Sequence, residues 1–428
     1  MSSDADADML HLLAAGSVSV PPLLALPSLA ARHGATAAAG LAALRGALPW
    51  AARLQLAVAL ALLCIGYLSV LRAAAAPGAG RLLLVPPVVA ANLVIPLLFD
   101  VRSELLTRVA AAFLFAWLAN FKAAGLAVNR GPLAMSHWGF WQLALLYIVP
   151  IYPTESKSVG RSGRLGDSVG GARQLLGRFV AQTALFVAIA LVLISFDLPA
   201  VLRYYAYALG LYGFISFLMT GPAVPLTSVA GLEVVPPFDA PWMSASLAEF
   251  WARRWNNTVG LTLRSLCYDP IIEGRLVREG GDDAHDSAGG ACADGAKDGQ
   301  QGEQQAAAPP RPSRRRRFWG TAAVFAASGL AHELVFAYSM APKFVWGASM
   351  FFFVQAPLLQ LENSILRCLK AAGRTPPWAV RWLAAQAALM AAAHLFFFPL
   401  LEAHTDTAQR VCAAISENVQ LLGAALRA

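Results

Sequence analysis

Apolar runs long enough to cross a lipid bilayer recur along this chain of 428 residues, and they constrain its fold more than any other feature. At about 1.5 Å per residue, a helix of roughly 20 residues spans a hydrocarbon core of ~30 Å. In lipid only helices and closed barrels satisfy the backbone, and these runs lack the polar alternation of barrel strands. We therefore predict an all-α, polytopic transmembrane helical bundle of about 8–9 spans with additional interfacial amphipathic helices. The predicted spans cover about residues 54–74, 82–99, 105–128, 138–152, 175–196, 200–220, 318–338, 344–366 and 379–400.

The composition excludes a soluble globular domain. Hydrophobic residues make up 57% of the chain and charged residues 14%, against roughly a quarter charged in ordinary soluble domains. The formal charge of +8 does not indicate a nucleic-acid partner, because basic residues of membrane proteins gather in cytoplasmic loops and at lipid headgroups. The five cysteines lack CxxC spacing, which predicts reduced thiols and neither a disulfide framework nor a metal site.

The runs divide the chain into two membrane parts, residues 49–277 and 318–403. Residues 1–48 form a variable N-terminal extension with neither a signal-peptide nor a transit-peptide pattern. Residues 278–317 are rich in Gly, Asp and Gln, which predicts a disordered charged insertion loop between the two parts. A tail of residues 404–428 follows the second part. We find no internal repeat, which disfavours an inverted-repeat transporter.

Two groups of basic residues set the expected orientation. One lies between residues 157 and 178, and Arg314–Arg317 directly precede the span at 318–338. Both are expected at the cytosolic face. Between them Leu247, Trp251, Trp255 and Val259 recur near helical spacing. A full crossing there would put the two basic groups on opposite sides, so we predict an amphipathic helix lying in the cytosolic interface.

Several spans carry polar side chains. Asn120 and Lys122 in the run at 105–128 predict a face that packs on protein or reaches an interface. Gln355 and Glu362 in the run at 344–366 are candidates to line a tunnel. His394, in an apolar stretch rich in phenylalanine, is interpreted as a packed histidine.

The run from Phe318 to Tyr338, FWGTAAVFAASGLAHELVFAY, has an ionisable pair in its middle. Such groups are costly in a bilayer and mark functional sites. Ser328 and Gly329 share a face with His332 and leave space beside its imidazole. An imidazole is the usual group for taking a proton from a hydroxyl, so we predict an intramembrane catalytic pocket here. On this helix alone, a histidine hydrogen-bonded across helices explains the pattern equally well. Glu333 points about 100° away, which favours a structural partner such as an arginine of a neighbouring helix.

A base alone does not transfer a group, because a polar side chain must also orient the reactants or stabilise developing charge. Asn256 and Asn257, in the sequence WARRWNN, are the candidates. Trp251 and Trp255 give this segment an aromatic surface on the same inferred side of the membrane as the start of the His332 helix. Arg254, with the arginine before it, is suited to phosphates of an anionic cofactor or to lipid headgroups, and we favour headgroups.

Three motifs together carry a family resemblance. They are WLANFK with GPL after it (Trp117–Lys122, Gly131–Leu133), PFDAPWMSASLAEFWARRWN (Pro237–Asn256) and SGLAHELVF (Ser328–Phe336). In order and spacing they resemble the plant wax synthases, long-chain-alcohol O-fatty-acyltransferases of the membrane-bound O-acyltransferase superfamily, over roughly residues 50–400. The family pattern reads FWGRRWN, so Ala252 stands in a glycine position. The N-terminal extension and the insertion have no counterpart in the pattern.

The resemblance implies acyl transfer from acyl-CoA to a long-chain alcohol or another lipid alcohol, giving wax esters, with no bound cofactor, in a multi-pass protein of the endoplasmic reticulum membrane. By it, His332 matches the catalytic histidine and Asn256 the second catalytic residue. The candidate substrate contacts are Trp251, Arg254, Trp255, Asn257, Ser328 and Gly329. Diacylglycerol and sterol remain alternative acceptors. A transporter with a proton relay through His332 and Glu333 is the alternative of another class. The partners are thus acyl-CoA, a lipid alcohol and membrane lipids; no oligomeric state is predicted.

Overall fold

The computed structural model describes residues 26–135, 138–154, 172–229, 234–278, 312–339 and 346–402, with scattered positions between 413 and 424. This described part is built from helices, and one antiparallel bridge joins Pro153 to Val234. Most of the predicted insertion, and parts of the N-terminal extension and the C-terminal tail, lie outside the described residues.

Seven helical stretches of the described chain are long and apolar enough to cross a membrane. This confirms an all-helical, multi-pass membrane protein, with fewer crossings than the predicted 8–9. The seven stretches are Trp50–Ala74, Ala79–Leu98, Leu105–Ala127, Arg173–Ser195, Ala200–Leu226, Arg314–Ser339 and Trp378–Leu400.

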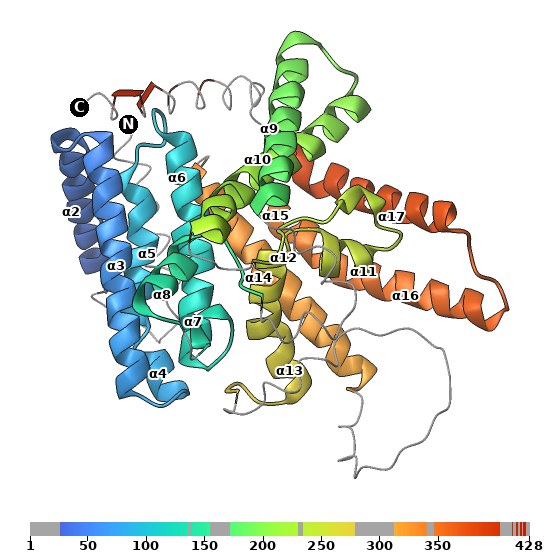
Figure 1. Cartoon of the computed structure of the whole chain (residues 1–428), viewed down its shortest axis with the longest axis horizontal. Coiled ribbons are helices and arrows are strands. Elements are labelled where there is room, and N and C mark those ends of the chain that lie inside the picture. The colour runs from blue at the N-terminus through green and yellow to red at the C-terminus, as the bar shows by residue number, and fades with distance from the viewer. Residues whose placement is uncertain are drawn as a thin grey trace.

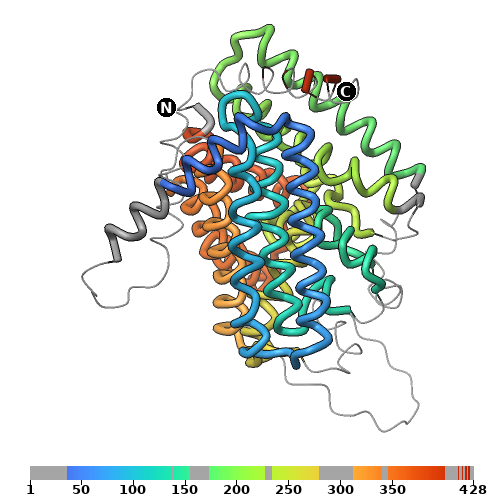
Figure 2. Tube along the Cα trace, turned by 90° about the vertical axis from the view of Figure 1, so that its left-hand side faces the viewer, coloured from blue at the N-terminus to red at the C-terminus, as the bar shows by residue number. Residues whose placement is uncertain are grey.

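The first three crossings form an upright bundle, which Figure 2 shows from its outer side. The first crossing is α3 (Trp50–Ala74), which follows α2 (Leu26–Ala47). The second consists of α4 (Ala79–Leu83), α5 (Pro86–Val94) and η1 (Ile95–Leu98). The third consists of α6 (Leu105–Ala111), the π-helix η2 (Ala112–Ala119) and α7 (Asn120–Ala127). The facing side chains of these crossings share one apolar core, to which α8 also contributes.

The run at 138–152 does not cross the membrane, which corrects one predicted span. Its helix α8 (Phe140–Ile148) has nine residues, or about 14 Å at 1.5 Å each, half of what a crossing needs. It ends because Val149 precedes Pro150, which pushes Val149 into an extended conformation with ψ 142°. The open carbonyl end of α8 is closed by Lys122, whose Nζ donates to Leu146 O and, at 2.8 Å, to Val149 O. Lys122 therefore packs on protein, one of the two placements expected for it.

The run at 344–366 is also not one crossing. It divides into α15 (Gly347–Phe353) and α16 (Gln355–Ala371), which meet at Val354. α16 is too polar to complete a crossing. It carries Glu362, Asn363, Arg367 and Lys370, and the last three are exposed. A helix with this polar face cannot lie with all sides in lipid.

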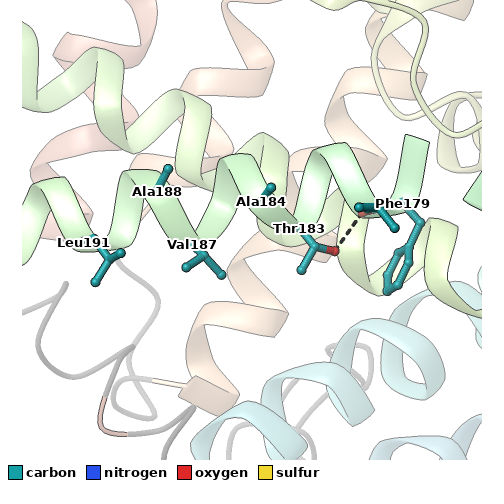
Figure 3. A pocket seen from close by; sticks show the side chains of 7 residues that line it. Phe179, Thr183, Ala184, Val187, Ala188 and Leu191 are labelled. Atoms are coloured by element: carbon teal, nitrogen blue, oxygen red, sulfur yellow. Dashed lines mark hydrogen bonds between the residues drawn. The ribbon is translucent and has the colours of Figure 1, made fainter. Parts of the chain in front are cut away.

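The α9–α10 hairpin projects from the upper part of the molecule in Figure 1. It consists of α9 (Ala172–Ser195) and α10 (Ala200–Val229), which pack on each other. Pro222 and Pro225 lie inside α10, so the helix continues beyond residue 220, where the predicted span ends. One side of α9 carries an apolar cavity of about 510 Å³ (Figure 3), lined by Phe179, Val180, Thr183, Ala184, Val187, Ala188 and Leu191.

The segment between α10 and the predicted insertion folds into short pieces. They are η5 (Pro241–Met243), α11 (Leu247–Glu249), the π-helix η6 (Phe250–Arg254), α12 (Asn257–Leu263), the π-helix η7 (Arg264–Tyr268) and α13 (Asp269–Glu273). The predicted amphipathic helix is thus interrupted, and the break falls at Trp255 and Asn256, where the backbone of Asn256 is left-handed with φ 45°. Asparagine is one of the few residues other than glycine that adopts this conformation readily.

The helix α14 (Arg314–Ser339) runs through the middle of the molecule, between the N-terminal bundle and the C-terminal helices (Figure 1). The latter are α15, α16, α17 (Trp378–Ala392), the π-helix η10 (Ala393–Phe397) and α18 (Phe398–Glu402). Arg314–Arg317 form the exposed first turn of α14. Its last turn is fixed to the bundle, because Arg108 Nε donates to Tyr338 O at 2.9 Å and Tyr338 Oη donates to Leu93 O at 2.6 Å.

Candidate active site

The imidazole of His332 has a defined orientation on α14. Its Nδ1 lies 2.8 Å from the carbonyl oxygen of Ser328, one turn earlier. A carbonyl oxygen only accepts hydrogen bonds, so Nδ1 must carry the proton. The neutral ring therefore presents Nε2 as its basic atom, with the lone pair directed away from the backbone of α14.

Two aromatic side chains from distant parts of the sequence hold this ring. Phe352 of α15 stacks on the imidazole with ring centroids 4.2 Å apart and planes inclined by 29°. Trp117 of η2 meets it in an edge arrangement at 4.6 Å and 63°. Trp117 belongs to the WLANFK motif, so the first and third motifs meet at the imidazole. The aromatic rings fill the space beside His332. The intramembrane pocket expected there is not found among the described residues, and the cavity noted above lies on α9.

The small residues before His332 serve the packing of two helices. A Cβ on Gly329 would lie 3.0 Å from Ser349 Cα and 3.2 Å from Ser349 O, so α15 occupies the room that glycine leaves. Ser328 is buried and supplies the carbonyl that binds the imidazole. Glu333 is buried too, and its Oε1 accepts a hydrogen bond of 3.0 Å from Ser349 N. This contact gives Glu333 a structural partner at the start of α15, in the backbone of a neighbouring helix.

Asn256 lies at the break between η6 and α12 and is almost fully buried. Its Oδ1 caps α12 by accepting from Val259 N at 3.3 Å. Its Nδ2 forms no hydrogen bond among the described residues, so this group is available as a donor. Asn257 turns to the preceding loop, where its Nδ2 donates to Pro236 O at 3.0 Å and its backbone N donates to Pro237 O at 2.8 Å.

Arg254 also holds the loop rather than presenting a free charge. It forms an ion pair with Glu249 at 2.7 Å, and its Nη1 donates to Asp239 O at 3.0 Å. Burial alone would raise the pKa of Glu249. The hydrogen bonds from Ala245 N and Arg254, and the charges of Arg254 and Arg253, hold that pKa below its ordinary value. Arg253 itself is exposed.

The WARRWNN segment reaches the imidazole through shared aromatic neighbours. The ring of Trp251 lies 5.8 Å from that of Phe352, the ring that stacks on His332. Its Nε1 donates to Gln355 Oε1 at 3.1 Å. Trp255 packs in an apolar cluster that also contains Trp117 and Ala331, the residue before His332. The sequence neighbours of Asn256 and of His332 therefore belong to the same cluster.

Gln355 and Glu362, the predicted tunnel candidates of the 344–366 run, bind this segment and the turn of α11 before it. Besides accepting from Trp251, Gln355 donates to Phe351 O at 3.0 Å. Glu362 accepts from Leu247 N at 3.0 and 3.1 Å, at the start of α11. Burial raises the pKa of Glu362, although the N–H groups of Leu247 and Ala248 act in the opposite direction.

The structure thus brings Trp251, Trp255, Asn256, Ser328 and Gly329 to the surroundings of His332, and it places Arg254 and Asn257 in the loop that supports them. Sequence reasoning missed Trp117 and Phe352 as contacts of the imidazole. Membership of the WLANFK motif was the available signal for Trp117. Nothing in the run of three phenylalanines distinguished Phe352.

No family model matches the chain, but several known proteins are similar to it. It is 25% identical over 299 residues to "Acyl-CoA--sterol O-acyltransferase 1" of Arabidopsis thaliana, covering 70% of this chain and 76% of that protein. It is 25% identical over 350 residues to "Probable long-chain-alcohol O-fatty-acyltransferase 2" of the same plant, covering 79% and 87%. It is 31% identical over 206 residues to the "Long-chain-alcohol O-fatty-acyltransferase" of Simmondsia chinensis, covering 47% and 57%.

These similarities show distant homology to the membrane-bound O-acyltransferase group, and the multi-pass helical fold is in keeping with it. Within it, the chain is a distant homologue of the plant wax synthases and of acyl-CoA sterol acyltransferase, and is a membrane O-acyltransferase of that type.

Proposed function

We propose that this protein transfers the acyl group of an acyl-CoA to the hydroxyl of a long-chain fatty alcohol, forming a wax ester. The observation that carries the proposal is the imidazole of His332, whose Nδ1 is bound to Ser328 O so that Nε2 is left as a base inside the helical bundle. The two membrane parts, 49–277 and 318–403, would form one catalytic unit, because Trp117 and Asn256 come from the first part and His332 from the second.

His332 Nε2 takes the proton of the acceptor hydroxyl while the hydroxyl oxygen bonds to the thioester carbonyl carbon. The carbonyl oxygen gains negative charge, and Asn256 Nδ2 donates a hydrogen bond to it. The carbon–sulfur bond then breaks, and the coenzyme A thiolate recovers the proton from the imidazolium. No acyl-enzyme is formed, and the chain needs no bound cofactor for these steps.

Sterol is the second candidate acceptor, because a sterol acyltransferase is among the relatives at 25% identity over 70% of the chain. Diacylglycerol is a third acceptor for the same chemistry. The relatives named above are all acyltransferases, so they lend nothing to the transporter alternative. The wax synthase resemblance favours the endoplasmic reticulum membrane as the site of action.

The test is expression in a host that lacks neutral-lipid acyltransferases, fed in parallel with fatty alcohol, sterol or diacylglycerol. We expect wax esters in the first culture. The ester formed identifies the acceptor, and the absence of any ester above the empty-vector level would overturn the proposal.

Two variants test the residues. Loss of a general base slows a reaction roughly 10²- to 10⁴-fold, and we expect this range for His332→Ala. The matched control is His394→Ala, because His394 packs against the ring of Tyr204 at 5.0 Å. Asn256→Ala should lose about 10²- to 10³-fold, as for an oxyanion donor, whereas Asn363→Ala, on the exposed face of α16, should remain active. Equal rates for each variant and its control would refute the assigned roles.

A further inference from the structure

Thr258 has a buried hydroxyl that the fold leaves without a partner. The residue is 0% exposed, and its Oγ1 has no hydrogen-bond partner among the described residues. Buried polar groups are nearly always hydrogen-bonded, so each exception calls for an explanation, such as a catalytic role. Thr258 is two residues after Asn256, the proposed donor to the carbonyl oxygen.

The local backbone explains why this hydroxyl is unpaired. Two other threonine hydroxyls within helices donate to the carbonyl four residues earlier, Thr262 to Thr258 O at 2.8 Å and Thr183 to Phe179 O at 2.8 Å. For Thr258 that carbonyl would belong to Arg254. The preceding helix ends at Arg254, because the backbone is extended at Trp255 and left-handed at Asn256, and Arg254 O instead accepts from Asp239 N at 3.0 Å.

The hydroxyl lies on the inward face of α12. Thr258, Val259, Thr262 and Leu263 are the buried residues of this helix, and they form one face of it. Val259 and Leu263 pack in the cluster that contains Trp117, a ring partner of the His332 imidazole, and Ala331, the residue before His332. Thr258 thus lies on the buried face of α12 that packs toward this cluster.

We propose that Thr258 is a catalytic residue whose hydroxyl, together with Asn256 Nδ2, donates a hydrogen bond to the thioester carbonyl oxygen of acyl-CoA. This inference rests on the proposed acyl transfer. As the acceptor oxygen bonds to the carbonyl carbon, the carbonyl oxygen becomes negatively charged. Two donors fixed in advance stabilise that charge without reorganisation. Thr258 exchanges no atom or proton with the substrate, so the balance of the transfer step is unchanged.

The experiment compares Thr258→Val with Thr262→Val in purified protein, by steady-state ester formation and by thermal unfolding in detergent. Thr262 is the matched control, because it lies one turn later on the same buried face and its hydroxyl already has a partner. We expect kcat of T258V to fall about 10- to 100-fold, since Asn256 still donates, with KM changed less than kcat. Its unfolding midpoint should equal or exceed that of the wild type, because the substitution removes an unpaired buried polar group.

The control should show the opposite pattern. T262V should unfold at a lower temperature than the wild type and keep most of its kcat. A rescue variant, Thr258→Ser, keeps a hydroxyl at position 258 and should retain most of the rate that T258V loses. If T258V does not accumulate in the membrane, Thr258→Ala against Thr262→Ala gives the same comparison.

Several results would overturn the inference. Wild-type kcat in T258V would show that the hydroxyl takes no part. A lower midpoint in T258V with unchanged kcat would show that the hydroxyl binds a structural water. Parallel losses of kcat and midpoint in both variants would show a packing effect. Failure of the wild type to form any ester would instead refute the acyl transfer itself, and the inference with it.

Discussion

Replacing Gly329 with alanine should separate α14 from α15 and disturb the imidazole. The new Cβ would lie 3.0 Å from Ser349 Cα, 3.2 Å from Ser349 O and 3.2 Å from Phe353 Cε1. Ordinary van der Waals contact begins at 3.4 Å, so α15 must move by a few tenths of an ångström. Two of the three atoms belong to the backbone and cannot rotate away. Overpacking of this kind costs about 1–3 kcal/mol.

The gain in helix propensity partly offsets that cost. Alanine is favoured over glycine within a helix by roughly 0.5–1 kcal/mol, so the net destabilisation of Gly329→Ala is about 0–2.5 kcal/mol. The effect on rate should be clearer, because α15 carries Phe352, which stacks on His332, and Ser349 N, which binds Glu333. Displacements of about 1 Å cost about 10²-fold in rate, and we expect a loss of roughly tenfold for this smaller shift.

The assay is ester formation together with thermal unfolding in detergent, with Gly66→Ala as the control. Gly66 also lies within a helix, α3, but nothing lies within 4 Å of the Cβ it would gain. Gly66→Ala should therefore be at least as stable as the wild type and fully active. If Gly329→Ala matches this control in both measurements, then the contact between α14 and α15 does not position the imidazole.

Two further perturbations test how the segments around the site are held. Lys122→Met removes the Nζ donor of two hydrogen bonds, to Leu146 O and to Val149 O. It should lower the free energy of unfolding by about 1–3 kcal/mol for each carbonyl left without a donor. An unchanged unfolding midpoint in detergent would contradict this. Glu249→Gln tests the pH dependence of stability, because the fold lowers the pKa of Glu249. The carboxylate therefore stabilises the fold fully above about pH 4.3. This contribution is lost as the pH falls through the lowered pKa. The difference in unfolding midpoint between wild type and variant should be largest at pH 7 and shrink below about pH 4, whereas a difference independent of pH would show that the ion pair with Arg254 is not its source.

Most of the crossings could be predicted from the sequence, because the length of an apolar run is a local property that the bilayer thickness selects. The two predicted spans that fail show the limit of that reasoning. Pro150 ends α8 after nine residues, and the charges of α16 form one face of it. Both runs are rich in apolar residues, but the position of one proline in the first and of the polar residues in the second prevents a crossing.

The location of the candidate site could also be predicted from the sequence, because an ionisable residue such as His332 is costly inside an apolar run. The geometry of the site could not. The bond from His332 Nδ1 to Ser328 O depends on a side-chain torsion, and the unpaired hydroxyl of Thr258 depends on the left-handed backbone at Asn256. Neither leaves a periodic mark in the sequence.

The sequence by itself determined a helical membrane protein, the order of its motifs, its resemblance to the wax synthases and the position of His332 in the chain. The tertiary structure decided that the ring partners of that histidine are Trp117 and Phe352, that Arg254 and Asn257 hold a loop, and that α15 fills the room beside Gly329. The physical reason is that helix formation in lipid depends on neighbours along the chain. Contacts such as that of Trp117 with His332 join residues far apart in sequence, and they form only when whole helices pack.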